Sequence, residues 1–400
     1  MPALAYSTRP ACQKVQDIIR FVASDLPRLN TACRDGALAL HEWVRQVRQA
    51  VVDIDDAVPG LDPDERLTLL QALGFIVASG ERHAQALRHE PGWIVRLLPG
   101  VEPALAAAAA SERVPVLTAE LYWERNTGWP PLTFTGEDHE LFFISAVRTQ
   151  VELRAAANRQ IRALLSQNWT PSTAEGARML RAAAAAMKES HGQYLDFRRG
   201  PQGEPLMTPA QFNEMRVWLA GTRIAGRGYA GANAAYIADM VVTDYLLGTA
   251  DGDYDTYVRG FAQYQSPQGR ECVATDRERR PLVLVLAESL GMSAADVDRA
   301  TVPQVAERVR LAPAALGWSL AAFKSLVDEF IGASGAHVGL VHVYLEKYRE
   351  TMSQEEVDRM PVKPTHGTGG NSHDHTRHVH DMRRKAPRIR KLLAALKESS

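Results

Sequence analysis

Residues 330–349 read FIGASGAHVGLVHVYLEKYR, and the spacing of their apolar residues decides the fold. At helical spacing, one stripe collects Phe330, Ala333, His337, Leu340, Val341, Tyr344, Leu345 and Tyr348. Apolar residues at i, i+3, i+4 and i+7 are typical of a helix that faces a core. His337 lies in the middle of this stripe, where an imidazole must hydrogen bond both ring nitrogens or bind something with one of them. The stripe is therefore compatible with a structural core histidine and with a metal-ligating one.

Small residues surround His337 and lower the helix propensity of this stretch. Gly332, Gly335 and Gly339 each cost helical stability, which a flat ligand lying close to the backbone would explain. The surrounding periodicity predicts one long helix over 313–349, broken or bent near Gly332 and Gly335.

Composition excludes several classes of protein. With 400 residues, 46% of them hydrophobic, the chain can bury one large core or a core and a smaller domain. The formal net charge of -1 gives no electrostatic reason to expect a nucleic-acid partner. No apolar run approaches the roughly 18 residues of a membrane span, so no membrane partner is expected. Three widely spaced cysteines suit reduced thiols, which predicts a cytoplasmic location.

Helical periodicity recurs along the whole chain and predicts an all-α fold in three parts. Residues 1–114 form several short helical segments, a small N-terminal helical domain. Residues 115–140 are irregular and rich in aromatic side chains, which predicts a connector that packs over a domain junction or a pocket. Residues 141–400 form a large helical domain, in which 139–167 and 172–197 are long periodic segments.

Arg216 is the second unusual residue of the sequence. The run Thr208-Pro209-Ala210-Gln211 predicts a capping box at the start of a helix. On that helix Phe212, Met215, Arg216 and Leu219 share one face. An arginine on an apolar face must meet a carboxylate or reach water, so Arg216 indicates an internal salt bridge or a bound acid.

A glycine-rich segment and a histidine-rich tail remain. Gly226, Gly228 and Gly231 have the GxGxxG spacing, but no strand is expected before them and no β-rich segments exist, which excludes a Rossmann dinucleotide site. In the tail, His375, His378 and His380 have a spacing that metal ligands can have. The cations Arg377, Arg383 and Arg384 beside them disfavour a bound metal ion.

Four motifs in this order resemble the haem-dependent indoleamine 2,3-dioxygenase/tryptophan 2,3-dioxygenase superfamily, including its pyrrolnitrin-pathway, monodechloroaminopyrrolnitrin synthase type. They are FNEMRVWLAG (residues 212–221, with Arg216), YAGANAAY (229–236), HVGLVHVY (337–344) and HGTGG (366–370). The similarity runs from about residue 95 to the end of the chain. It implies a large helical haem-binding bundle, haem b as cofactor, a small aromatic amino acid as substrate, and O₂ or peroxide as second substrate.

Carried over residue by residue, the resemblance implies roles for particular positions. His337 becomes the axial ligand of the haem iron, and Arg216 binds the substrate carboxylate. The other implied substrate-binding residues are Phe212, Thr368 and Gly369. The implied distal-pocket residues are Gly231, Ala232, Asn233, Ala234, Phe142, Ser145 and Ala146. A mobile loop over 361–382 would close the pocket.

The sequence departs from the dioxygenases at two places. Their distal serine lies in FFLVS, whereas Ser145 stands one position earlier in FFISA. Glu120 stands where the dioxygenases have a pocket tyrosine. No side chain stands out as a general base, so no catalytic residue is assigned.

The expected function is a haem-dependent oxidative enzyme of specialised metabolism, such as antibiotic biosynthesis. Its substrate would be L-tryptophan or a substituted tryptophan, and its reaction indole-ring oxygenation or oxidative rearrangement. Two alternatives stay open. One is a haem monooxygenase or hydroxylase of another aromatic amino acid such as tyrosine. The other is a non-catalytic helical protein that binds haem, or a partner through its histidine-rich tail.

Overall fold

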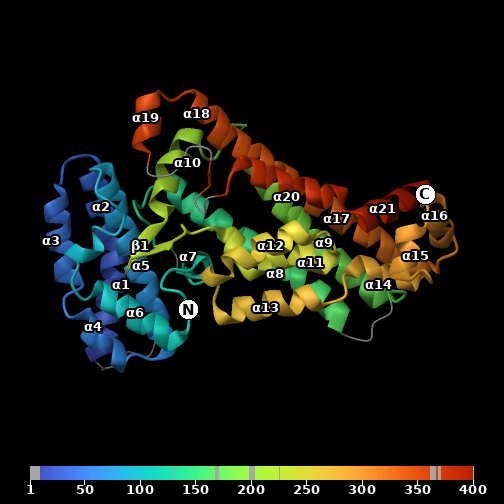
Figure 1. Cartoon of the computed structure of the whole chain (residues 1–400), viewed down its shortest axis with the longest axis horizontal. Helices are drawn as coiled ribbons and strands as arrows, with labels where there is room; N and C mark the ends of the chain where they lie inside the picture. Colours follow the sequence, from blue (N-terminus) through green and yellow to red (C-terminus); the bar gives the residue numbers. More distant parts are fainter. Residues whose placement is uncertain are drawn as a thin grey trace.

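The computed structural model describes residues 10–128, 130–166, 171–197, 203–224, 226–360, 366–367 and 371–399. These residues form an all-α fold with one two-stranded hairpin, so the predicted fold class is confirmed. The N-terminal helices gather at one end of the molecule and the C-terminal helix α21 at the other, with the long helices α8, α9 and α17 between them (Figure 1).

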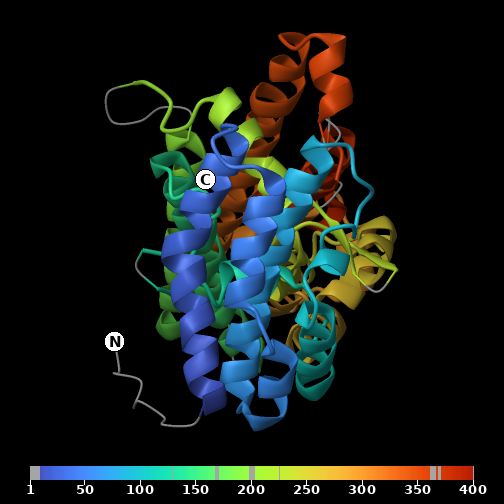
Figure 2. The same ribbon diagram turned by 90° about the vertical axis from the view of Figure 1, so that its left-hand side faces the viewer.

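The first helices of the chain pack around α5. They are α1 (Pro10–Arg20), α2 (Leu26–Arg34), α3 (Leu40–Ala50), α4 (Ile54–Ala57), α5 (Pro63–Ala86) and α6 (Val101–Glu112), with the π-helix η1 (Phe21–Asp25) and the 3₁₀ helices η2 (Val58–Gly60) and η3 (Val95–Leu97). Figure 2 shows these helices (blue to cyan) side by side. Asp62 begins α5 with a capping box, because its carboxylate accepts from the Glu65 amide and its own amide donates to Glu65.

The connector holds one short helix, α7 (Ala119–Trp123), and packs at the junction. The ring of Phe134 lies 4.7 Å from that of Phe75 in α5 and 5.8 Å from that of Trp218. Trp123 borders the large cavity described below. Aromatic residues of this stretch therefore contact both the junction and the cavity.

The rest of the chain is built from longer helices and one hairpin. Its elements are α8 (Asp138–Ser166), α9 (Ala174–Asp196), α10 (Pro209–Arg216), β1 (Thr222–Ile224), β2 (Arg227–Tyr229), α11 (Ala238–Leu247), α12 (Gly252–Phe261), α13 (Pro267–Glu278), α14 (Leu282–Ser289), α15 (Ala294–Arg299), α16 (Val302–Arg310), α17 (Ala314–Val341), α18 (Tyr348–Glu350), α19 (Gln354–Arg359), α20 (His373–Lys385) and α21 (Pro387–Ser399), with the 3₁₀ helices η4 (Val217–Leu219), η5 (Ala234–Tyr236) and η6 (Ala262–Tyr264) and the π-helix η7 (His342–Lys347). Helix α9 packs along both α8 and α17.

Helix α17 runs unbroken through its glycines, so the break expected near Gly332 and Gly335 is wrong. A Cβ added at Gly332 would lie 2.6 Å from Cε1 of His191, and one at Gly335 would lie 3.3 Å from Cε1 of His380. The glycines thus make room for imidazole rings of α9 and α20, and this face of α17 contacts protein rather than a flat ligand. Regular helix ends only at the π-helix η7.

The glycine-rich segment holds the hairpin, which corrects the expectation that no strand precedes Gly226. Strand β1 pairs antiparallel with β2, with Thr222 opposite Tyr229. Gly226 lies at the turn with a φ of 74°, a conformation that favours glycine. This hairpin is the whole sheet in the described part of the chain, so the Rossmann fold remains excluded there.

Among the residues that the structure describes, no helix is both long and apolar enough to cross a lipid bilayer.

Candidate functional site

A large cavity is lined by residues of α8, α9, α11, α12, α17 and α20. Its volume is about 290 Å³, close to the lower end of the roughly 300–1,000 Å³ of small-molecule pockets, and its mouth is open to solvent. Aromatic and aliphatic side chains form most of the wall, among them Trp123, Phe143, Tyr254, Leu340 and Tyr344.

His337 faces this cavity from α17. It lies deep inside the molecule, yet its side chain is exposed because the cavity opens in front of it. Burial, with smaller effects of the cations Arg383 and Arg154, lowers the pKa of His337 to about 4, so the imidazole is neutral at physiological pH. The Tyr194 ring lies 5.4 Å from it, centre to centre. No residue of the described chain hydrogen bonds with its ring nitrogens, which leaves them available to a ligand.

The small-residue segment after the hairpin borders the same cavity. Ala232, Asn233 and Ala234 lie in its wall. Asn233 also caps η5, since its Oδ1 accepts from the Ala235 amide at 2.9 Å. Three of the four residues predicted in this segment therefore meet His337 at one cavity.

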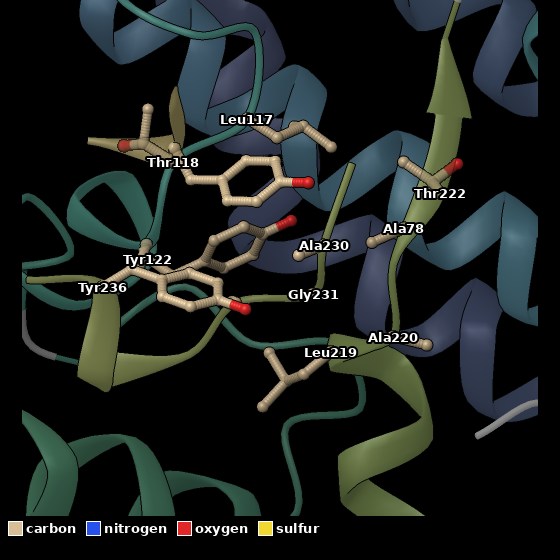
Figure 3. A pocket seen from close by; sticks show the side chains of 13 residues that line it. Ala78, Leu117, Thr118, Tyr122, Leu219, Ala220, Thr222, Ala230, Gly231 and Tyr236 are labelled. Carbon is tan, nitrogen blue, oxygen red and sulfur yellow. The ribbon is translucent and has the colours of Figure 1, made fainter. Parts of the chain in front are cut away.

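Gly231 borders a second, much smaller cavity at the junction with the N-terminal helices. Tyr122 and Tyr236 lie on one side of it and Ala78 and Thr222 on the other (Figure 3). Ala232 borders both cavities. The larger cavity is the candidate site, because it holds the available imidazole.

Helix α8 presents Ala146 to the large cavity, whereas Ser145 is not among the residues that line it. Phe142 also lies off the wall, with its ring 4.8 Å from that of Phe197. Successive helical residues point about 100° apart, so the shift of the serine by one position leaves alanine at the cavity. Phe212 of α10 borders the cavity and packs edge-on against Phe143, at 5.7 Å.

Arg216 lies outside the cavity wall. It is fully buried, and burial lowers its pKa to about 10. Its Nε donates to Oδ1 of Asn213 and its Nη1 to the carbonyl of His366, both at 2.7 Å. The next residue, Gly367, does border the cavity. Arg216 is therefore joined to the cavity through the segment at 366–367.

The C-terminal segment forms one side of the cavity. Thr368 and Gly369 lie outside the described residues, but Gly367 and Asn371 border the cavity, and Asn371 donates to the Tyr257 hydroxyl at 2.6 Å. The later part of the loop expected over 361–382 is helical, since α20 begins at His373. Ser372 caps this helix by accepting from the His375 amide at 3.1 Å.

The histidines of the tail are divided among different contacts. The His375 ring packs on Tyr257, with centres 4.1 Å apart, His380 packs on Gly335, and His378 is exposed. Ligand atoms of His342, Glu346 and His373 instead lie within 4.8 Å of one another, because the Glu346 carboxylate is hydrogen bonded to both imidazoles.

Sequence reasoning missed two arginines that line the cavity, Arg154 of α8 and Arg383 of α20. Arg383 forms a two-pronged ion pair with Asp244 of α11. Arg154 falls on the buried stripe of the 139–167 periodicity, between Val151 and Ala157. Arg216 was noticed because it lies on the apolar stripe of a predicted helix. The same criterion would have found Arg154.

Glu120 also lies away from the large cavity. Its carboxylate accepts from the backbone amide and the hydroxyl of Ser266, and burial raises its pKa. It therefore joins the connector to the N-terminus of α13.

Comparison with known proteins adds no relative. No protein-family model matches the sequence, and a search of curated proteins finds no significant match.

Proposed function

We propose that this protein is a haem-dependent oxidoreductase that acts on L-tryptophan or a substituted tryptophan, by oxygenation or oxidative rearrangement of the indole ring. The observation that carries the proposal is His337, a neutral imidazole that faces the large, mostly apolar cavity. The resemblance of four motifs to the tryptophan-dioxygenase superfamily supports the same assignment. A role in specialised metabolism belongs to this proposal. So does a cytoplasmic location, which the free thiols of Cys12, Cys33 and Cys272 support.

The residues present fit haem b. His337 would ligate the iron, because the neutral form of histidine is the one that binds a metal. The small side chains of Ala333, Ala232 and Ala234 at the cavity would leave space for a flat macrocycle. When bound, haem would supply the oxidising chemistry, with O₂ or peroxide as the second substrate.

The chain itself would bind and orient the amino acid. Phe143 and Phe212 would pack against an aromatic substrate ring and exclude water from it. Arg216 is the proposed partner of the α-carboxylate, since a guanidinium binds a carboxylate with two parallel hydrogen bonds. To do so it would exchange its contact with the His366 carbonyl for one with the substrate. Substrate binding would then act on the segment around Gly367.

The test is the absorption spectrum of the purified protein loaded with haem. We expect a Soret band that disappears in His337→Ala and is retained in His378→Ala, a matched control on the exposed side of α20. A protein that takes up no haem, or an His337→Ala variant with an unchanged spectrum, would exclude the proposal.

A second measurement tests the substrate. L-tryptophan should shift the haem spectrum of the wild type, whereas Arg216→Leu should keep the haem and lose this shift. A larger shift with L-tyrosine would favour a tyrosine-oxidising enzyme. An unchanged tryptophan shift in Arg216→Leu would mean that another residue binds the carboxylate.

A further inference from the structure

We propose that Arg154 is an anion-binding residue of the large cavity and holds a carboxylate of the ligand that the cavity takes. The inference rests on the proposed function only in taking this cavity as the ligand site. It adds a binding residue that none of the sequence motifs indicates.

Arg154 is a buried cation that no protein anion balances. Only 3% of its surface is exposed, and it borders the cavity. Its Nε and Nη1 are buried without a hydrogen-bond partner, and no ion pair to it occurs within the described chain. Its guanidinium lies 4.8 Å from the centre of the Phe330 ring. Burying a charge without a partner is costly, so an anion from outside the chain is the expected partner.

Asp244, the protein carboxylate whose charge raises the pKa of Arg154, already has other partners. Asp244 accepts from Nε of Arg383 at 2.9 Å and from Nη2 of the same side chain at 2.7 Å. It also accepts from the hydroxyl of Thr249 at 2.6 Å. Arg383 lies over the same Phe330 ring, at 4.5 Å. Two guanidinium groups therefore share this end of the cavity with one carboxylate, which leaves one positive charge in excess.

The excess charge fits a ligand carboxylate in both chemistry and position. Burial lowers the pKa of Arg154 to about 10, so the group still carries its charge at neutral pH. A guanidinium favours carboxylates because its planar fork matches their two oxygens. Arg154 and His337 both border this cavity. A ligand whose acid group meets Arg154 would therefore lie in the cavity that His337 faces.

Two molecules of the proposed function carry this chemistry. Haem has two propionate side chains, and an amino acid has an α-carboxylate. Both are aliphatic carboxylates, and one set of variants separates them.

The first experiment needs no ligand. In the protein free of haem, Arg154→Met should raise the melting temperature, because an apolar side chain of similar length replaces a buried charge. Arg159→Met is the matched control, since Arg159 is an exposed arginine on the same helix, and it should leave the melting temperature nearly unchanged. A lower melting temperature in Arg154→Met would show that Arg154 is a structural cation and would overturn the proposal.

The second experiment uses ligand pairs that differ only in the acid group. If Arg154 holds a propionate, the wild type should bind haem about tenfold or more tightly than haem dimethyl ester, and Arg154→Met should bind the two alike. If Arg154 holds the carboxylate of the amino acid, Arg154→Met should still prefer haem over haem dimethyl ester. It should lose the preference for L-tryptophan over tryptamine. The proposal would be overturned if Arg154→Met preferred haem over its dimethyl ester, and L-tryptophan over tryptamine, as strongly as the wild type does.

These outcomes stay distinct from failure of the proposed function. A protein that takes up no haem would exclude the haem enzyme. The melting temperature of Arg154→Met and the binding of tryptophan against tryptamine to the apoprotein, measured by calorimetry, would still test Arg154.

Discussion

Gly332 of α17 lies directly against the imidazole of His191 in α9. A Cβ at position 332 would be 2.6 Å from Cε1 and 2.9 Å from Nδ1 of that ring. The ring cannot turn away freely, because its Nδ1 is hydrogen bonded to Glu329 at 2.9 Å, one turn earlier on α17. The close approach of α9 and α17 beside His337 therefore depends on the missing side chain of a glycine.

Gly332→Ala should lower the free energy of unfolding. Alanine gains about 1 kcal/mol of helix propensity over glycine, but forcing a methyl group into a filled space costs roughly 1–3 kcal/mol. We expect a net loss of about 1 kcal/mol, measured by urea denaturation. The double variant Gly332→Ala/His191→Ala should recover it. A Gly332→Ala protein as stable as the wild type would mean that the ring moves at little cost.

Asn30 joins three N-terminal helices and the connector through one buried amide. Its Nδ2 donates to the Ser79 hydroxyl at 2.8 Å and to the Phe134 carbonyl at 2.9 Å, and its Oδ1 accepts from Trp43 at 2.9 Å. Asn30→Leu would leave these partners buried and unsatisfied, at about 1–3 kcal/mol for each group. We expect a loss of about 3 kcal/mol or more in chemical denaturation.

A double-variant cycle checks that prediction. Trp43→Phe removes one of the groups that Asn30→Leu leaves unsatisfied, so the two losses should add to more than the loss of the double variant. Strict additivity would contradict the view that Asn30 satisfies Trp43.

The sequence predicted the features that depend on local chemistry. The capping box at Thr208 is present, with the Gln211 amide 3.2 Å from the Thr208 hydroxyl. The predicted apolar stripe of α17 also holds, since Phe330, Ala333 and Leu340 are buried. Caps and periodicity involve residues close in sequence, so they can be predicted without knowing the tertiary contacts.

The features that sequence reasoning got wrong depend on a partner element. Gly332 looked like a helix breaker because its contact, His191, is distant in sequence. The hairpin at 222–229 was missed because three-residue strands carry little alternation. Which of two buried arginines would border the cavity, Arg154 or Arg216, depends on how α8 and α10 are placed, which their own sequences do not encode.

His83 should make stability depend on pH. Burial, and then the charge of Arg82, lowers the pKa of His83 to about 3 from an ordinary 6.5. Between these values the unfolded chain binds the proton and the folded chain does not, so stability should fall as the pH drops from about 6.5 towards 3. The contribution to the slope is at most about 1.4 kcal/mol per pH unit.

His83→Gln removes the titrating group and keeps a donor for the Oδ1 of Asn30, which His83 Nε2 approaches at 3.2 Å. Its unfolding free energy, measured at several pH values, should decline less steeply below pH 6.5 than that of the wild type. Parallel profiles for the two proteins would show that His83 is not the group responsible.

Arg383→Leu should be strongly destabilising, in contrast to Arg154→Met. Asp244 is fully buried, and removing its partner leaves a carboxylate without a counter-ion, at about 3–5 kcal/mol. Arg384→Leu is the control, because Arg384 is an exposed neighbour that pairs with Asp381 at the surface, and it should cost less than about 1 kcal/mol. The double variant Arg383→Leu/Asp244→Leu should recover much of the loss, as measured by denaturation. If Arg383→Leu alone lowers the free energy of unfolding only slightly, Arg154 has replaced Arg383 as the partner of Asp244. The double variant Arg383→Leu/Arg154→Met should then show the large loss.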